Sequence, residues 1–183
     1  MNHFGIIVMV LSGMVFIPIA NAQGQMSRAQ ELPIGYVSLD GSIIEAPCAI
    51  DAGSRDQSVS ITTVPVSQII QDRESPISHF SIRLINCVLT PIMPGKPNWQ
   101  SFRITFDGPT DGRNFDVFGH ANGLSMKITD SDGNTAIPGK PMADLAIKPG
   151  ETTLNYGVRV VANNKHLKSG NYQATIRFKM DYY

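Results

Sequence analysis

The most regular alternation of apolar and polar residues lies at the C-terminal end of the chain, in residues 170–183, GNYQATIRFKMDYY. Side chains two residues apart point to the same face of a β-strand, so this pattern predicts one long strand with one buried face. A strand at the end of a chain exposes a hydrogen-bonding edge unless a neighbour covers it. Its apolar positions are Tyr172, Ala174, Ile176, Phe178, Met180 and Tyr182.

Shorter alternating runs recur along the rest of the chain, separated by residues that favour turns. Residues 132–134, DGN, predict a hairpin turn, and residues 66–73 come nearest to a helical turn. Many short strands with regular turn signals are typical of an antiparallel β-sandwich. Strands are predicted at residues 36–44, 58–62, 79–87, 101–108, 123–130 and 154–163.

The first 22 residues predict a secretory signal peptide, cut between Ala22 and Gln23. An apolar run is followed by Ala-Asn-Ala, which is the small-residue pattern of a cleavage site. The segment before the run lacks Lys and Arg, so an uncleaved membrane anchor is the alternative. Gly13 and Pro18 interrupt the run and disfavour that alternative. Residues 23–183 would then form one exported domain.

Charge and cysteine content narrow the function classes further. The chain carries 15 basic and 15 acidic residues, so no basic face for nucleic acid is expected. An even number of cysteines in an exported chain predicts a disulfide, here between Cys48 and Cys87. A metal site is the alternative, but no other Cys or His lies within four residues of either one.

Motifs for catalysis or metal binding are weak. His79, His120 and His166 have no metal-binding spacing, and the chain contains no G-x-S-x-G nucleophile motif. DSDGN at residues 130–134 resembles the start of a calcium loop, but the sequence has Thr135 and Pro141 where such a loop needs its Gly and Glu. We therefore expect no enzyme activity, cofactor or metal, and an exported enzyme is the weakest alternative.

Two segments at opposite ends of the mature chain together resemble the pilins of chaperone–usher fimbriae. The first is DGSIIEAPCAI at residues 40–50, where a glycine in an alternating segment precedes the first cysteine. The second is the tail, with Gly170 fourteenth from the end and Tyr182 penultimate. The resemblance covers residues 35–183. The segments FRITFDG and DGNTAIPGK and the tail are most similar to the minor terminator pilin of P-type pili.

The resemblance implies an all-β fold, an incomplete immunoglobulin-like antiparallel sandwich that a donor strand from another chain completes. Its domains would be a signal peptide (1–22), an N-terminal extension (23–47, with the donor strand at about 35–47) and a pilin domain (48–183). The donor residues would be Leu39, Gly41, Ile43 and Glu45, with Glu45 near a polar rim. The C-terminal strand would bind the chaperone through Gly170, Tyr172, Ala174, Ile176, Phe178, Met180, Tyr182 and Tyr183. Of these, Tyr172, Ile176, Phe178 and Met180 would line the groove.

The implied function is that of a minor fimbrial subunit assembled by donor-strand exchange, which terminates growth and anchors the fibre at the outer-membrane usher. Its partners would be a periplasmic chaperone, the usher and adjacent pilins. It would pass through the periplasm to the cell surface or stay at the fibre base in the outer membrane. The alternatives are an adaptor or tip-fibrillum pilin with an open groove and, less favoured, a carbohydrate-binding adhesin.

Overall fold

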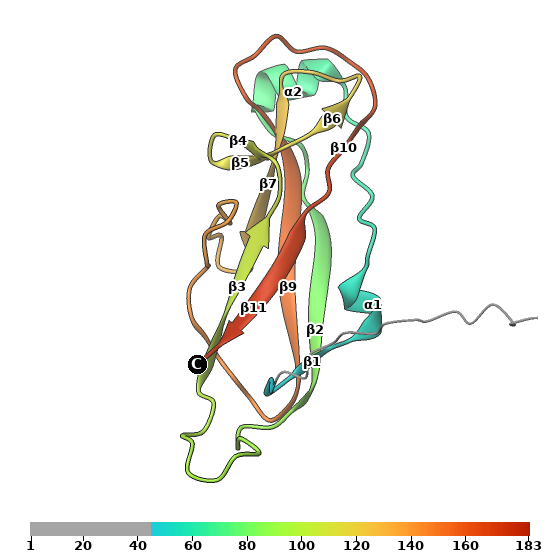
Figure 1. The fold of residues 1–183 in the computed structure, drawn as a ribbon. Coiled ribbons are helices and arrows are strands. Elements are labelled where there is room, and N and C mark those ends of the chain that lie inside the picture. Colours follow the sequence, from blue (N-terminus) through green and yellow to red (C-terminus); the bar gives the residue numbers. More distant parts are fainter. Residues whose placement is uncertain (1–44) are drawn as a thin grey trace, which may run out of the picture. The chain divides into compact units, whose positions relative to one another are not determined.

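The computed structural model describes residues 45–183, which form antiparallel β-sheets (Figure 1). The three-stranded sheet has the order β11 (Arg177–Tyr182), β3 (Ser101–Asp107) and β8 (Leu145–Ala146). A small sheet pairs β10 (Tyr172–Gln173) with β6 (Phe118–Gly119). The six-stranded sheet has the order β1 (Ala49–Ile50), β2 (Ser78–Cys87), β9 (Gly150–Ala162), β7 (Leu124–Asp130), β5 (Asn114–Asp116) and β4 (Thr110–Asp111).

Alternating apolar positions place one face of each long strand in the core, because successive side chains of a strand point to opposite faces. The predicted strands 79–87, 101–108, 123–130 and 154–163 are confirmed as β2, β3, β7 and β9, although β9 begins four residues earlier. Their inward side chains are almost fully buried and form one cluster. The cluster includes Ile82, Leu84, Phe102, Ile104, Phe106, Met126, Ile128, Tyr156 and Val158.

For two of the predicted strands, the expected backbone hydrogen bonding is absent or interrupted among the described residues. Residues 58–62 do not form a strand, and the C-terminal strand is divided into β10 and β11 by residues 174–176. The division arises because the partner changes: β10 pairs with β6, whereas β11 pairs with β3. β3 ends at Asp107, so residues 174–176 pass Gly108 without a strand beside them. Burial still alternates at every residue from 171 to 180, as the pattern predicted.

Two short helices connect β1 to β2. α2 (Val66–Asp72) lies at the predicted helical turn; it begins after Pro65 and ends at Arg73, which adopts the left-handed conformation common at helix ends. α1 (Ala52–Arg55) was not predicted, and the Asp51 side chain caps it by accepting the N–H of Gly53 at 3.0 Å. Within residues 45–183, no helix is long and apolar enough to cross a membrane.

The predicted disulfide is confirmed between Cys48 and Cys87, which are both buried. It fastens the start of β1 to the end of β2. The strand ladder between β1 and β2 has only two residue pairs, Ala49 with Ile85 and Ile50 with Leu84. The disulfide adds a covalent restraint to this short ladder, which the hydrogen bond from the Asp51 N–H to the Arg83 carbonyl extends by one further contact at 2.9 Å.

Candidate functional site: an apolar groove beside the C-terminal strand

A groove with a volume of about 1260 Å³ opens into the hydrophobic core. One wall is the segment that follows α1, blue-green in Figure 1, and the other is the red segment that contains β10 and the start of β11. The floor consists of apolar side chains from strands of both larger sheets, so the groove is an opening in the core. The floor residues are Phe80, Phe106, Leu124, Met126, Ile128, Val158 and Val160.

In the first wall, residues 57–64, apolar side chains pack inward, but the backbone makes no hydrogen bonds to a neighbouring described strand. Val59 and Ile61 are half-buried and pack against the core. The backbone groups of residues 57–64 form no backbone hydrogen bond to any other described residue. The Gln57 side chain, which donates to the carbonyl of Ser81 at 3.2 Å, gives a separate attachment. The predicted strand at 58–62 is absent for this reason: its alternation is present, but no described strand lies beside it.

The second wall is the C-terminal segment. β11 is hydrogen-bonded to β3 along one edge, and its other edge has no partner among residues 45–183. Phe178 is half-buried and packs against Phe106 on the floor, with ring centroids 6.3 Å apart. The groove lining includes Gly170, Tyr172, Ala174, Ile176 and Phe178 from the predicted C-terminal set.

Three residues of that set lie beyond the lining: Met180, Tyr182 and Tyr183. Tyr182 packs against Trp99 with ring centroids 6.4 Å apart, so Trp99 has a local packing role at this end of β11. Tyr183 is 54% exposed, and the guanidinium of Arg103 lies over its ring at 4.8 Å. The last residue is thus held on β3 while much of its surface remains accessible.

Glycines allow two backbone segments to cross at the other end of the groove. His120 and Ala121 both donate their N–H groups to the carbonyl of Asn171, at 2.9 and 3.1 Å. A Cβ on Gly170 would lie 2.6 Å from the Ala121 nitrogen, and one on Gly119 would lie 2.4 Å from the Asn171 oxygen. No side chain fits at such distances, so Gly170 has a packing role in this chain.

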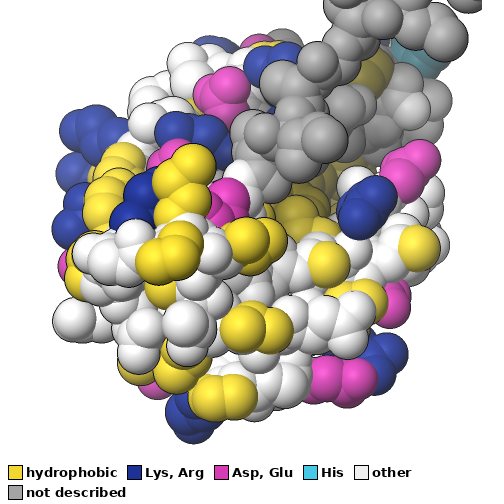
Figure 2. Space-filling model, turned by 60° about the horizontal axis from the view of Figure 1, so that its bottom comes forward, with side chains coloured by type: hydrophobic (Ala, Val, Ile, Leu, Met, Phe, Trp, Pro, Cys, Tyr) yellow, Lys and Arg dark blue, Asp and Glu magenta, His cyan; other side chains and the backbone are white. Residues whose placement is uncertain are grey.

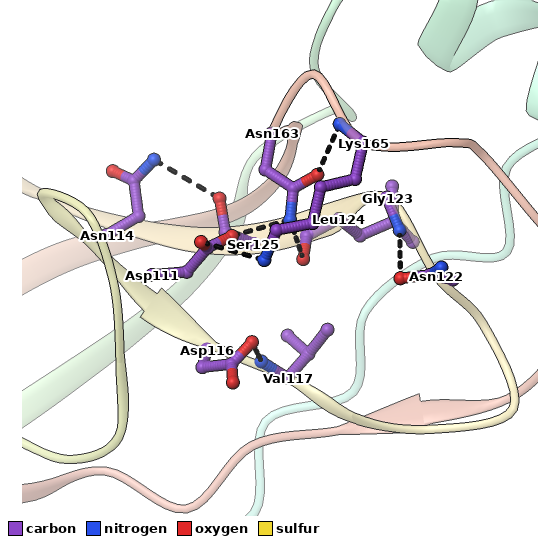
Figure 3. A network of polar contacts seen from close by, with 10 residues as sticks. All are labelled: Asp111, Asn114, Asp116, Val117, Asn122, Gly123, Leu124, Ser125, Asn163 and Lys165. Atoms are coloured by element: carbon purple, nitrogen blue, oxygen red, sulfur yellow. Dashed lines mark hydrogen bonds and ion pairs between the residues drawn. The ribbon is translucent and has the colours of Figure 1, made fainter.

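A polar network fixes the chain where it leaves β9 toward the C-terminal segment (Figure 3). The Asn163 amide donates to Asp111 and to the carbonyl of Leu124, and the Lys165 ammonium lies 3.1 Å from Asp111. Burial raises the pKa of the Asp111 carboxyl, but the hydrogen bonds from Asn163 and Lys165 outweigh it and lower the pKa overall. The network joins the β4–β5 hairpin to β7 and β9 beside the groove.

The described residues show no arrangement for metal binding. His79, His120 and His166 are all exposed, and within residues 45–183 no three His, Cys, Asp or Glu side chains could share a metal ion. One carboxylate oxygen of Asp130 accepts the N–H groups of Asp132 and Asn134 at 3.0 and 2.8 Å. DSDGN is therefore a tight turn, as predicted, although only the isolated bridge between Thr129 and Thr135 follows it.

Of the four predicted donor residues, only Glu45 belongs to the described part of the chain. It is half-buried, and its carboxylate accepts the N–H of Ile92. Leu39, Gly41 and Ile43 lie outside the described residues, as do the predicted signal peptide and the predicted strand at 36–44. The floor residues from β7 and β9, and the wall at 57–64, were not predicted as parts of the groove.

Comparisons with known proteins agree with this geometry. The Fimbrial protein family matches residues 37–183. The PRS and PAP fimbrial minor pilin proteins of Escherichia coli are each 30% identical over 150 residues, which cover 81% of this chain and 77% of each relative. The P pilus rod subunit PapA shares the fold, with a TM-score of 0.67 and 24% identity over 75% of this chain and all of that chain. The chain belongs to the fimbrial pilin family of chaperone–usher pili, whose members are structural subunits of cell-surface fibres rather than enzymes.

Proposed function

We propose that the groove receives a β-strand from another protein, first from a periplasmic chaperone during export. The observation that carries this proposal is an apolar floor lying between two backbone segments whose facing edges have no described partner. An added strand would satisfy those edges with main-chain hydrogen bonds and would place alternate side chains on the floor. Each aliphatic side chain buried there would contribute about 1.5–3 kcal/mol.

The C-terminal strand supports the same proposal, because it forms one wall and ends in an accessible residue. Gly170, Tyr172, Ala174, Ile176 and Phe178 would contact the incoming strand. Met180 and Tyr182 would hold β11 in register against the core. The exposed surface of Tyr183, a residue that is 54% exposed, would be available to the chaperone, while its carbonyl oxygen accepts the N–H groups of Gln100 and Ser101 at 2.8 and 3.2 Å.

We further propose that this chain is a minor subunit that stops fibre growth and stays at the base of the fibre, bound to the outer-membrane usher. The 30% identity to the PRS and PAP minor pilin proteins favours a minor subunit. A terminator would keep the chaperone's strand in its groove and would not exchange it for the N-terminal extension of a further subunit. The alternative is an adaptor, whose groove would accept that extension.

A blocked-groove variant tests the strand-binding proposal. Ala174 is half-buried in the lining, so Ala174→Trp adds bulk to the groove without removing any atom of the core. Lys179→Trp on the exposed face of β11 is the matched control. We expect the first variant to lose its chaperone complex and to be degraded in the periplasm, whereas the control accumulates normally. Normal capture of the Ala174→Trp protein would refute the proposal.

Peptide exchange separates a terminator from an adaptor. The chaperone-bound protein is mixed with a peptide that copies the N-terminal extension of a pilin from the same fimbria, and release of the chaperone is followed over hours. We expect no release. Release of the chaperone with incorporation of the peptide would mean that the protein is an adaptor or shaft subunit. That result would overturn the terminator proposal but not the proposal that the groove binds a strand.

A further inference from the structure

The loop between β2 and β3 ends in an exposed apolar tip. Ile92 is 88% exposed and Met93 is 60% exposed, side by side in the chain. The base of the loop is held firmly, because Pro91 is buried and the N–H of Trp99 donates to the carbonyl of Leu89 at 2.8 Å. Single exposed apolar residues are common, whereas Ile92 and Met93 are adjacent and form a small apolar patch that a partner could cover.

The same loop is tied to the start of the described chain. The N–H of Val88 donates to the carbonyl of Pro47 at 2.8 Å, and the N–H of Ile92 donates to the Glu45 carboxylate. The disulfide joins the residues next to these, Cys48 and Cys87. Glu45, the first residue that the structure describes, therefore lies beside this loop. The end of the molecule that carries the loop comes forward in Figure 2, where hydrophobic side chains lie among the polar ones.

This location has a consequence that rests on the proposed function, in which residues 35–47 form a strand in the groove of a neighbouring subunit. A chain spans at most about 3.6 Å per residue, so a partner that held residue 43 would have to come within about 7 Å of the Glu45 backbone. A subunit that holds Ile43 in its groove must then approach the surface around Glu45, whose carboxylate accepts the N–H of Ile92. We infer that Ile92 and Met93 form a second contact, in which the loop tip docks on the rim of the groove that receives this chain's own extension.

The composition of the loop suits such a contact. Pro91, Pro94 and Pro97 restrict the backbone, so little conformational entropy would be lost on docking. Exclusion of water from two adjacent aliphatic side chains would add stability to the strand interaction without changing the strand itself. The tip would thus slow dissociation of the two subunits, because short-range apolar contacts act mainly on the dissociation rate.

The test measures dissociation of a two-subunit complex. The partner is the most abundant pilin of the same fimbria, purified with its periplasmic chaperone and mixed with the full mature chain. We compare wild type with Ile92→Ser/Met93→Ser and with Ile70→Ser, a control on α2 whose side chain is 60% exposed, as that of Met93 is. We expect the double variant to dissociate at least about tenfold faster, while the control dissociates at the wild-type rate.

A peptide copying residues 35–47 separates the two proposals, because it carries the donor strand without the loop. If the peptide binds the partner pilin and the double variant dissociates at the wild-type rate, the inference about the loop is wrong and the donor-strand proposal stands. If the peptide does not bind, both are wrong. A photo-crosslinking residue at position 93 gives a second measurement: a cross-link to the partner is expected, and cross-links to the chain itself alone would overturn the contact.

Discussion

Breaking the Cys48–Cys87 disulfide should lower the free energy of unfolding by about 4 kcal/mol. The two cysteines are 39 residues apart, and closing a loop of that length removes about 13 cal/mol/K of chain entropy from the unfolded state. Since domains of this size are stable by only about 5–15 kcal/mol, this loss is a large share of the total. The two ladder pairs between β1 and β2, the hydrogen bond from the Asp51 N–H to the Arg83 carbonyl and the bond from the Gln57 side chain to Ser81 would then hold the chain that leads to the groove wall.

The assay is urea unfolding of the mature chain, followed by the fluorescence of Trp99. The chain contains one Trp, and its ring packs edge-on against Tyr182, so the signal reports whether β11 is docked. Three samples are compared: the oxidised protein, the Cys48→Ala/Cys87→Ala variant and the oxidised protein after reduction with dithiothreitol. The reduced protein keeps both sulfur atoms, so it separates loss of the cross-link from the small cavities that alanine leaves.

Both altered samples should unfold at much lower urea concentrations, and their binding of a chaperone strand should fall with them. The result that refutes the reasoning is a reduced protein within about 1 kcal/mol of the oxidised one. It would mean that packing around Ile50 and Leu84 holds β1 without help from the covalent bond. A large loss in the alanine variant alone would assign the effect to cavities instead.

Two further predictions concern residues outside the disulfide. The hydrogen bond from Lys127, together with the charge of Arg159, holds the pKa of Glu74 below its usual value despite the opposing effect of burial. Glu74→Gln should therefore lower the free energy of unfolding by about 1 kcal/mol at neutral pH, a figure that allows for screening of a side chain that is 36% exposed. This difference should disappear as the pH falls through the lowered pKa, since the wild-type carboxylate is then protonated too; Glu151→Gln is the control, and a loss that persists in acid would contradict the explanation. Gly170→Ala should lower the free energy of unfolding by about 1–3 kcal/mol, and the melting temperature with it, because the added Cβ would lie 2.6 Å from a backbone nitrogen. Gly53→Ala is the control, and equal melting temperatures of the two variants would refute the packing role of Gly170.

The sequence predicted side-chain burial better than it predicted hydrogen bonding. Residues 171–180 alternate between exposed and half-buried as their pattern indicates, yet residues 174–176 belong to no strand. Val59 and Ile61 likewise pack inward from a segment that has no ladder. Alternation records which side chains face the core, whereas a strand also requires a neighbouring backbone, which a pattern within one segment cannot supply.

The groove was predicted from the resemblance of the chain's ends, but its floor was not. Alternation marked Met126 and Val158 as core residues in the same way that it marked Ile82 and Ile104. Nothing in a strand's own pattern tells which core side chains will be covered by the opposite sheet and which will face an opening. That difference depends on which strands lie over them in space.

By itself, the sequence determined the fold class, the long central strands, the disulfide and the apolar face of the C-terminal segment, because each depends on residue types at short, regular spacing. Only the tertiary structure decided where the C-terminal strand changes partners, which backbone edges have no described neighbour and which core residues lie at the floor of the groove. It also placed the loop tip at Ile92 beside Glu45. These features arise from contacts between segments distant in the chain, and such contacts form only when the sheets are assembled.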